Sequence, residues 1–314
     1  MPLAAGLFFC AGAERKCNWL LVRHVPGSQR CVVFFPGDLS DFAAGGGLPY
    51  SYSLEALFWV LCRKYPDETL VLVKPHMMVD RFAIYVNFML VDGQGNPRPL
   101  TQLKAQEAAG DGDVEGAGCV GAALAEDAAQ PGVETPRAVL HLERLLDAVR
   151  SELGGDLPAR LTLVGFSKGA VVLGAVMREA RTEVAFWQKV DAVHFVDAGL
   201  TVPGNLFPVS AEDLQALKGA VGEEFVIWLH GTPRQWEDEQ RPFVAEETLA
   251  FEQRCRAADV HVERRYYAAG QPPTLNQHFD AVRCFCTGDA ARDEEEGGDR
   301  HLGFFAAWTE ACSG

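Results

Sequence analysis

A serine flanked by two glycines is the feature that most restricts how this chain can fold. The run Gly165-Phe166-Ser167-Lys168-Gly169 follows an apolar, β-branched segment, Arg160–Val164, and precedes an apolar stretch at Gly169–Arg181. In a strand, tight turn and helix of this kind, small residues two positions before and after the serine let strand and helix approach without a Cβ clash. We therefore predict a strand–turn–helix unit that holds the Ser167 hydroxyl above the edge of a sheet.

The rest of the chain repeats the alternation of short apolar runs, turns and helical stretches, which is typical of a mostly parallel sheet covered by helices on both faces. The first strand is expected near Trp19. The predicted strands are Trp19–Arg23, Cys31–Phe35, Thr69–Val73, Arg160–Val164, Ala192–Val196, Glu224–Leu229 and Val260–Tyr267. The predicted helices are Ser53–Tyr65, Pro136–Leu153, Gly169–Arg181 and Glu246–Ala258. Thr135-Pro136 is expected to cap the second helix.

Composition excludes several classes of protein. The 314 residues are 48% hydrophobic and 23% charged, as in a soluble globular protein, and they carry a formal net charge of −15. Such an acidic surface repels phosphate backbones, so nucleic acid is not an expected partner. No apolar stretch is long enough for a transmembrane helix. The nine cysteines, Cys284-x-Cys286 included, form no set of ligands with the spacing of a zinc site, and no metal or cofactor is expected.

Most of the negative charge lies in two segments that break the pattern. Residues 104–134 contain seven acidic residues, one lysine and 15 Ala or Gly, and Thr287–Arg300 contains four consecutive acidic residues. Like charges in such runs repel and stay solvated, so we predict an acidic insertion and an acidic loop outside the folded body.

A serine hydroxyl becomes a nucleophile when a base accepts its proton and an acid orients that base. In this architecture the chain order is serine, acid, histidine. His194 and His261 fall within predicted strands, where histidines are usually packed, whereas His278 follows the last strand in a polar loop, 271–278. We expect His278 to return over the carboxyl edge of the sheet and bring a ring nitrogen within about 3 Å of the Ser167 hydroxyl.

Two aspartates are candidates for the acid. Asp238 follows the strand Glu224–Leu229, which is the usual placement one strand before the histidine, although it stands among other acidic residues. Asp197 directly ends the strand Ala192–Val196, from which its carboxylate can also reach an imidazole. The geometry of the serine, the histidine and the acid decides between them.

Backbone amides are expected to stabilise an oxyanion beside Ser167. The first belongs to Lys168, whose side chain is expected to add positive charge at the rim. The second is expected from the turn after Cys31–Phe35, where Pro36 lacks an N–H and Gly37 or Asp38 is therefore the donor.

These residues resemble the α/β-hydrolase superfamily over residues 31–279. Within it the chain is similar to the eukaryotic family named after open reading frame 69 of human chromosome 2. The resemblance rests on Val33-Phe-Phe-Pro-Gly-Asp38, Val73-Lys-Pro75, Phe82-Ala-Ile-Tyr85-Val-Asn87-Phe88, Gly165-Phe-Ser-Lys-Gly169, Asp197-Ala-Gly199 and Asn276-Gln-His278-Phe279. It implies a single α/β-hydrolase-like domain over residues 1–314, a serine hydrolase activity and a mitochondrial location. Residues 1–10 show no clear transit peptide, which leaves the cytoplasm as the alternative location.

Three functions are compatible with these observations. The first is hydrolysis of an ester or thioester, in the manner of an esterase, thioesterase or lipase, through an acyl-enzyme at Ser167. Lipid-like acyl groups are favoured if Met77–Leu90 lines an apolar pocket, although core packing is the more common fate of such residues. The second is a catalytically inactive interaction or regulatory protein that binds a protein partner through its acidic loops. The third is a peptidase of the same fold.

Overall fold

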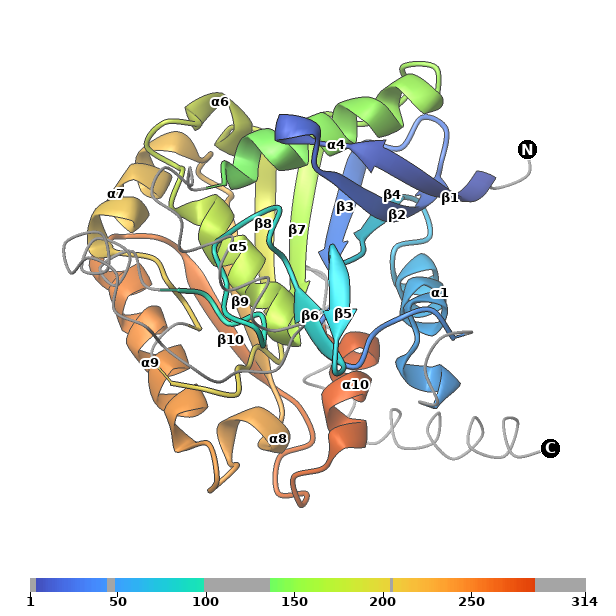
Figure 1. The fold of residues 1–314 in the computed structure, drawn as a ribbon. Helices are drawn as coiled ribbons and strands as arrows, with labels where there is room; N and C mark the ends of the chain where they lie inside the picture. Colours follow the sequence, from blue (N-terminus) through green and yellow to red (C-terminus); the bar gives the residue numbers. More distant parts are fainter. Residues whose placement is uncertain (1–3, 44–48, 99–135, 204–205, 286–314) are drawn as a thin grey trace, which may run out of the picture. The chain divides into compact units, whose positions relative to one another are not determined.

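The computed structural model describes residues 4–43, 49–98, 136–203 and 206–285 (Figure 1). The two predicted acidic segments, 104–134 and 287–300, lie outside these residues.

Eight strands of the described chain form one twisted sheet in the order β1-β2-β4-β3-β7-β8-β9-β10 (Figure 1). Strand β2 runs antiparallel to β1 and to β4, and the other pairs are parallel. The strands are β1 (Ala4–Ala11), β2 (Cys17–His24), β3 (Arg30–Phe35), β4 (Thr69–Val73), β7 (Arg160–Phe166), β8 (Val190–Val196), β9 (Val226–Gly231) and β10 (Val262–Tyr266). This is the sheet of the α/β-hydrolase fold, and the predicted fold class is confirmed.

Each of the seven predicted strands is present, and Thr69–Val73 has the predicted bounds. The expectation that the first strand begins near Trp19 is wrong, because β1 precedes it at the edge of the sheet. Leu7 and Phe9 of β1 are exposed while Cys10 is buried. The sequence of β1, AAGLFFCA, is continuously apolar but contains none of the β-branched residues by which the central strands are recognised. A short hairpin of β5 (Met77–Val79) and β6 (Phe82–Ile84) was also not expected.

The helices begin where capping groups are available. Helix α1 starts at Leu54 because the Ser53 side chain accepts a hydrogen bond from the Ala56 amide. Helix α4 starts at Ala138 with Arg137 at the N-cap position, so the prediction that Pro136 stands in its first turn is wrong, and Thr135 lies outside the described residues. Glu179 accepts hydrogen bonds from the first amides of this helix. The helices are α1 (Leu54–Lys64), α4 (Ala138–Glu152), α5 (Ala170–Met177), α6 (Val184–Trp187), α7 (Ala211–Ala220), α8 (Pro233–Trp236), α9 (Pro242–Ala257) and α10 (Leu275–Cys284).

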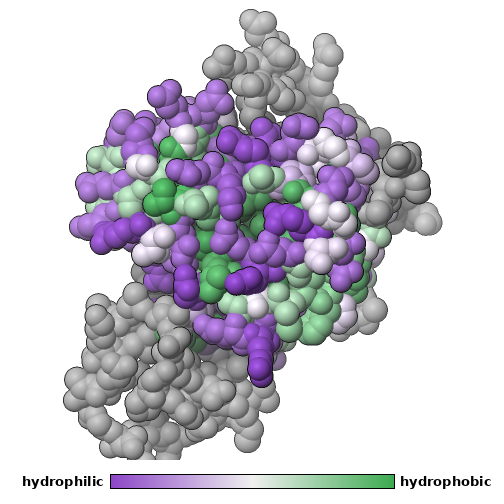
Figure 2. All heavy atoms as spheres, turned by 90° about the horizontal axis from the view of Figure 1, so that it is seen from above, coloured by the Kyte–Doolittle hydropathy of each residue, from purple (hydrophilic) through white to green (hydrophobic). Residues whose placement is uncertain are grey.

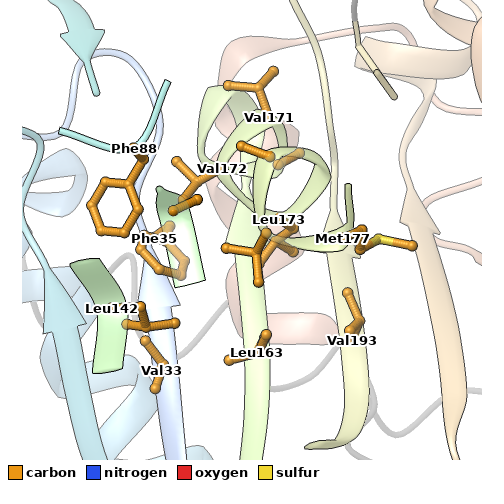
Figure 3. Close-up of a cluster of buried hydrophobic side chains, with 14 of the residues drawn as sticks. Val33, Phe35, Phe88, Leu142, Leu163, Val171, Val172, Leu173, Met177 and Val193 are labelled. Carbon is orange, nitrogen blue, oxygen red and sulfur yellow. The ribbon is translucent and has the colours of Figure 1, made fainter. Parts of the chain in front are cut away.

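Helix α5 anchors the main core. Every one of its residues is buried, because it is apolar on all sides and lies between the sheet and neighbouring segments. Figure 3 shows Val171, Val172, Leu173 and Met177 of this helix in the buried cluster, next to side chains of β3, β7, β8 and α4. The other labelled residues are Val33, Phe35, Phe88, Leu142, Leu163 and Val193. The packing fixes the helix directly after Ser167.

The opposite face of the sheet holds α10. Phe166, at the end of β7, contacts Phe279 of α10 edge to face, with ring centroids 5.4 Å apart. The Tyr52 ring stacks on the Phe279 ring, with ring centroids 3.9 Å apart. In Figure 1, α10 lies below the arrowheads of β3 and β7, at the carboxyl edge of the sheet.

The face of the molecule away from α10 is mainly hydrophilic, with smaller hydrophobic areas between the polar residues (Figure 2). Among the described helices, none combines the length and the apolar character required to cross a membrane.

A buried polar network joins the first hairpin of the sheet to α4. His141 Nδ1 accepts a hydrogen bond from the Ala13 amide, and its Nε2 lies 2.8 Å from Asn18 Oδ1. Since Nδ1 acts as an acceptor, the ring is neutral and donates through Nε2. Asn87 donates a second hydrogen bond to Asn18 Oδ1. Burial lowers the pKa of His141 to about 4, so the folded chain holds this ring neutral.

We expect His141 to make the free energy of unfolding depend on pH. The unfolded chain protonates this side chain near pH 6.5, whereas the folded chain does so only near pH 4, so stability falls as pH decreases from about 6.5 to about 4. His141→Gln cannot take up this proton and should show a smaller loss of stability over that interval. Urea unfolding at pH 7, 6, 5 and 4.5 measures the slope. Leu142→Ala, a destabilised variant without a change in titratable groups, should keep the wild-type slope, and an equal slope in H141Q would contradict the assignment.

Candidate functional site

The turn after β7 places Ser167 at the carboxyl edge of the sheet. Ser167 adopts a φ of 53°, in the left-handed region that L residues rarely occupy. A Cβ at Gly169 would lie 2.0 Å from the Phe35 carbonyl oxygen, and one at Gly165 would lie 2.8 Å from the Gly169 carbonyl oxygen. The glycines are therefore needed for the close approach that the sequence predicts.

The end of β3 meets this turn directly. A Cβ at Gly37 would lie 2.3 Å from Ser167 Cβ and 2.8 Å from Ser167 Oγ. Within the described residues, the amides of Gly37 and Asp38 donate to no acceptor. Two candidate donors of the oxyanion hole thus lie next to the serine.

His278 and Asp197 lie together beneath the sheet edge. His278 Nδ1 is 2.6 Å from Asp197 Oδ2, and both residues are buried. The His278 ring also contacts the Phe166 ring, with centroids 4.6 Å apart, which places it beside the residue that precedes Ser167.

Thr232, at the end of β9, holds the Asp197 carboxylate. Its amide donates to Oδ1 at 2.7 Å and its hydroxyl to Oδ2 at 3.0 Å. Asp197 is fully buried and has a φ of 46°, a conformation fixed in part by the hydrogen bond from its amide to the His230 carbonyl. Together with His278, these donors satisfy a carboxylate that would otherwise be buried without partners.

The contact with Asp197 determines which nitrogen of His278 carries the proton. Because the carboxylate only accepts hydrogen bonds, the proton lies on Nδ1 and Nε2 presents a lone pair. Gln235 Nε2 donates to the Asp197 carbonyl at 3.2 Å and lies 3.4 Å from His278 Nδ1. Two donors face each other in that second contact, so it positions the ring by packing rather than by a hydrogen bond.

The other candidate acid lies elsewhere. Asp238 pairs with Arg241 at 2.9 Å and with Arg234, and it makes no contact with His278. The expected placement of the acid after β9, which favoured Asp238, is not found. Thr232 follows β9 and donates to Asp197, and the carboxylate next to the histidine follows β8.

His278 belongs to helix α10, which begins at Leu275. The expectation of a loop at 271–278 is therefore wrong for residues 275–278. Thr274 Oγ1 accepts from the Gln277 amide, and Gln277 Oε1 accepts from the Thr274 amide. This reciprocal pair is a capping box, and the sequence Thr274-Leu-Asn-Gln277 contains its signature. The same kind of signature, Ser210-Ala-Glu-Asp213, begins α7, the other long helix that was not expected.

The Lys168 side chain does not add positive charge at a rim. It is fully buried and its Nζ lies 3.0 Å from Asp38 Oδ1. Burial lowers the pKa of Lys168 and raises that of Asp38, and each charge opposes the shift of the other. The charge is turned inward because the elbow packs closely against the segment after β6.

The hydrogen-bond contacts of His278 are to Asp197 and Gln235. The expected hydrogen bond of about 3 Å between His278 and the Ser167 hydroxyl is not present in this structure. Ser167 and His278 are each buried to all but 6% of their surface.

The segment Met77–Leu90 contributes to the core. Ala83, Ile84 and Phe88 are buried in the main cluster, and Met77 packs against it. Core packing therefore accounts for the apolar residues that a pocket for acyl chains would have used.

Two further histidines are buried away from Ser167. His194 Nδ1 lies 3.0 Å from His230 Nε2, whose Nδ1 lies 2.9 Å from the Tyr267 hydroxyl. Burial lowers the pKa of His194 to about 3. Within the part of the chain that the structure describes, no group of His, Cys, Asp and Glu could hold a metal ion.

Sequence comparisons relate the chain to one family. A family model described as C2orf69 matches residues 7–156 and 147–261. The chain is 26% identical over 294 residues to "Mitochondrial protein C2orf69 homolog" of Danio rerio, covering 88% of this chain and 78% of the relative. It is 23% identical over 292 residues to "Mitochondrial protein C2orf69" of Homo sapiens, covering 83% and 75%.

A structural comparison finds similarity to an IroE-like serine hydrolase from Shewanella oneidensis. The TM-score is 0.47 at 13% sequence identity, and the match covers 89% of this chain and 78% of that chain.

We expect the Thr232 hydroxyl to contribute measurably to stability, because it donates to a fully buried carboxylate. Thr232→Val should lower the free energy of unfolding by about 1.5–3 kcal/mol, the usual worth of a hydrogen bond to a charged group. Thr232→Ser keeps the hydroxyl and should lose only about 1 kcal/mol with the methyl group. Urea unfolding at pH 7.5 distinguishes the two. Equal stability of T232V and T232S would contradict this role.

Proposed function

This chain belongs to the C2orf69 family, and we propose that it is a serine hydrolase that cleaves an ester or thioester through an acyl-enzyme at Ser167. The observation that carries the proposal is the His278–Asp197 contact of 2.6 Å, on a ring that packs beside the turn holding Ser167. A fixed Nδ1–H tautomer leaves Nε2 as the base. Ser167, Asp197 and His278 come from three separate segments of the chain: Ser167 follows β7, Asp197 follows β8, and His278 lies in α10.

In the first step, Ser167 Oγ attacks the carbonyl carbon of the substrate and its proton moves to His278 Nε2. The electron pair of the carbonyl bond moves onto the oxygen, and the tetrahedral intermediate collapses as His278 returns the proton to the leaving alcohol or thiol. Water then attacks the acyl-enzyme with His278 again as base. Asp197 remains ionised and stabilises the imidazolium that forms in each step.

The oxyanion is held by the Lys168 amide and by the amide of Gly37 or Asp38. Two observations support this role. A Cβ at Gly37 would lie 2.8 Å from Ser167 Oγ, so this turn lies next to the serine. Within the described residues, the amides of Gly37 and Asp38 donate to no other group. Donors oriented before the reaction stabilise developing charge without further reorganisation.

Substrate binding is expected to bring Ser167 and His278 into hydrogen-bonding contact. Contacts between catalytic groups are often long in ligand-free sites and shorten in the substrate complex. Both residues are nearly buried, so a bound acyl group would also exclude water from them.

The location implied by the family resemblance is supported by the relatives, which are named mitochondrial proteins in Danio rerio, Mus musculus and Homo sapiens. We place the hydrolase in mitochondria on this ground.

Labelling by a fluorophosphonate tests the proposal. The wild type should be labelled at Ser167, and Ser167→Ala should not be labelled. His278→Ala and Asp197→Asn should slow labelling by roughly 10³-fold or more, because each disables the base. Asp238→Asn is the matched control and should be labelled at close to the wild-type rate, since Asp238 pairs with arginines instead. Labelling rates are measured by in-gel fluorescence, and the modified residue by mass spectrometry.

The alternative function makes the opposite prediction. A catalytically inactive interaction or regulatory protein would not be labelled under conditions that label a known serine hydrolase, or would be labelled equally in the S167A and H278A variants. Either result would exclude the hydrolase. If labelling succeeds, a panel of acyl esters, acyl thioesters and peptides identifies the substrate class and separates an esterase from a peptidase.

A further inference from the structure

A buried ion pair links the two segments that carry the candidate oxyanion donors. Lys168 follows Ser167 in the elbow, and Asp38 lies in the turn after β3. Lys168 Nζ lies 3.0 Å from Asp38 Oδ1, with the lysine side chain fully buried and the aspartate side chain 22% exposed. Removing two charges from water is unfavourable unless their geometry and additional hydrogen bonds compensate, so a pair at this position needs an explanation.

Both members of the pair have further partners in the segment that covers the turn. Asp38 Oδ1 accepts a hydrogen bond from the Ala83 amide at 2.7 Å. Lys168 Nζ donates to the Gln94 carbonyl at 2.6 Å and lies 4.6 Å from the centroid of the Phe82 ring. The Lys168 ammonium group therefore contacts Asp38, the Gln94 carbonyl and the Phe82 ring, and it does not point toward substrate.

The turn that carries Asp38 depends on the same covering segment. The Leu39 amide donates to the Arg81 carbonyl at 2.9 Å, and the Tyr85 hydroxyl donates to the Pro36 carbonyl at 2.7 Å. Leu39 and Arg81 have φ angles of 64° and 72°, so both residues of this contact have uncommon backbone conformations. Such conformations persist only where the surrounding contacts determine them.

We propose that Lys168 and Asp38 are positioning residues, whose buried ion pair fixes the spacing between the two amide donors of the oxyanion hole. The inference rests on the proposed function, since it assigns the pair a role at that site. The two side chains link Lys168, which carries the first amide donor, to the turn that carries the second donor. Gly37 of that turn lies against Ser167. Asp38 must also stay paired, because an uncompensated carboxylate next to the developing oxyanion would oppose its charge.

The rate of fluorophosphonate labelling, followed from pH 5 to 9, is the direct readout. Asp38→Asn combined with Lys168→Met removes both charges at similar side-chain volume. Replacing a buried ion pair by uncharged groups often leaves stability unchanged. The double variant should therefore keep a melting temperature near that of the wild type and yet label at least about tenfold more slowly, because donors displaced by a fraction of an ångström lose much of their effect.

The pH profile separates positioning from general structural damage. The rate on the high-pH plateau should fall, because the pair acts on the oxyanion. The charge of Asp38 also acts on His278, so the plateau rate and not the midpoint of the profile is the criterion. The control is Glu143→Gln combined with Lys189→Met, which removes an ion pair of 3.2 Å far from the elbow in sequence and should change neither quantity.

Each outcome decides the proposal. A folded double variant that labels at the wild-type rate, or one whose rate returns to the wild-type plateau at high pH, overturns it. If the double variant does not fold, Asp38→Glu decides, since it keeps both charges and an acceptor for the Ala83 amide but changes the length of the link between the two segments: a tenfold slower plateau supports the role, and a wild-type rate overturns it. Failure of the wild type to label overturns the hydrolase itself and this role with it, whereas labelling of the wild type and of the double variant alike overturns the ion-pair role alone.

Discussion

The close approach of the turn after β7 to the end of β3 is the contact on which the site depends. A Cβ at Gly169 would lie 2.0 Å from the Phe35 carbonyl oxygen, and one at Gly37 would lie 2.3 Å from Ser167 Cβ. Because both residues are glycines without a Cβ, Gly169 can pack against the Phe35 carbonyl and Gly37 against the Ser167 side chain. The serine is consequently held in a left-handed conformation next to two backbone amides. Helix α5, buried on every side, prevents the turn from relaxing.

Two sets of polar groups lie next to the turn that holds Ser167. On one side, Asp197 receives donors from Thr232 and His278, which come from the end of β9 and from α10. On the other side, Lys168 and Asp38 pair with each other and with backbone groups of the covering segment. Lys168 and Asp197 are fully buried and Asp38 is partly exposed, and each charge is retained because its partners are fixed by different elements. The orientation of every group then depends on the packing of the whole sheet edge.

Periodicity and turn chemistry predicted the central elements of the fold correctly. Strands such as Thr69–Val73 are buried on both faces and read as continuous apolar runs, so their location follows from local composition. Strand β1 was missed because its apolar run, AAGLFFCA, contains no β-branched residue, and α10 because a polar helix end was interpreted as a loop. Local signals existed for the helices, since Ser210 and Thr274 each begin a capping box. The edge strand had no such signal.

The sequence by itself determined the turn that carries Ser167, the order of strand and helix around it, and the fold class, because glycine spacing and apolar runs act over a few residues. It also singled out His278, whose ring lies 4.6 Å from that of Phe166, the residue before Ser167. Which aspartate meets that histidine was decided only by the tertiary structure, which brings Asp197 from β8 to 2.6 Å from the ring and turns Asp238 toward Arg241. The direction of the Lys168 side chain was decided in the same way. Such pairings join residues far apart in the chain, and their geometry depends on how strand ends and covering segments pack, which no local pattern records.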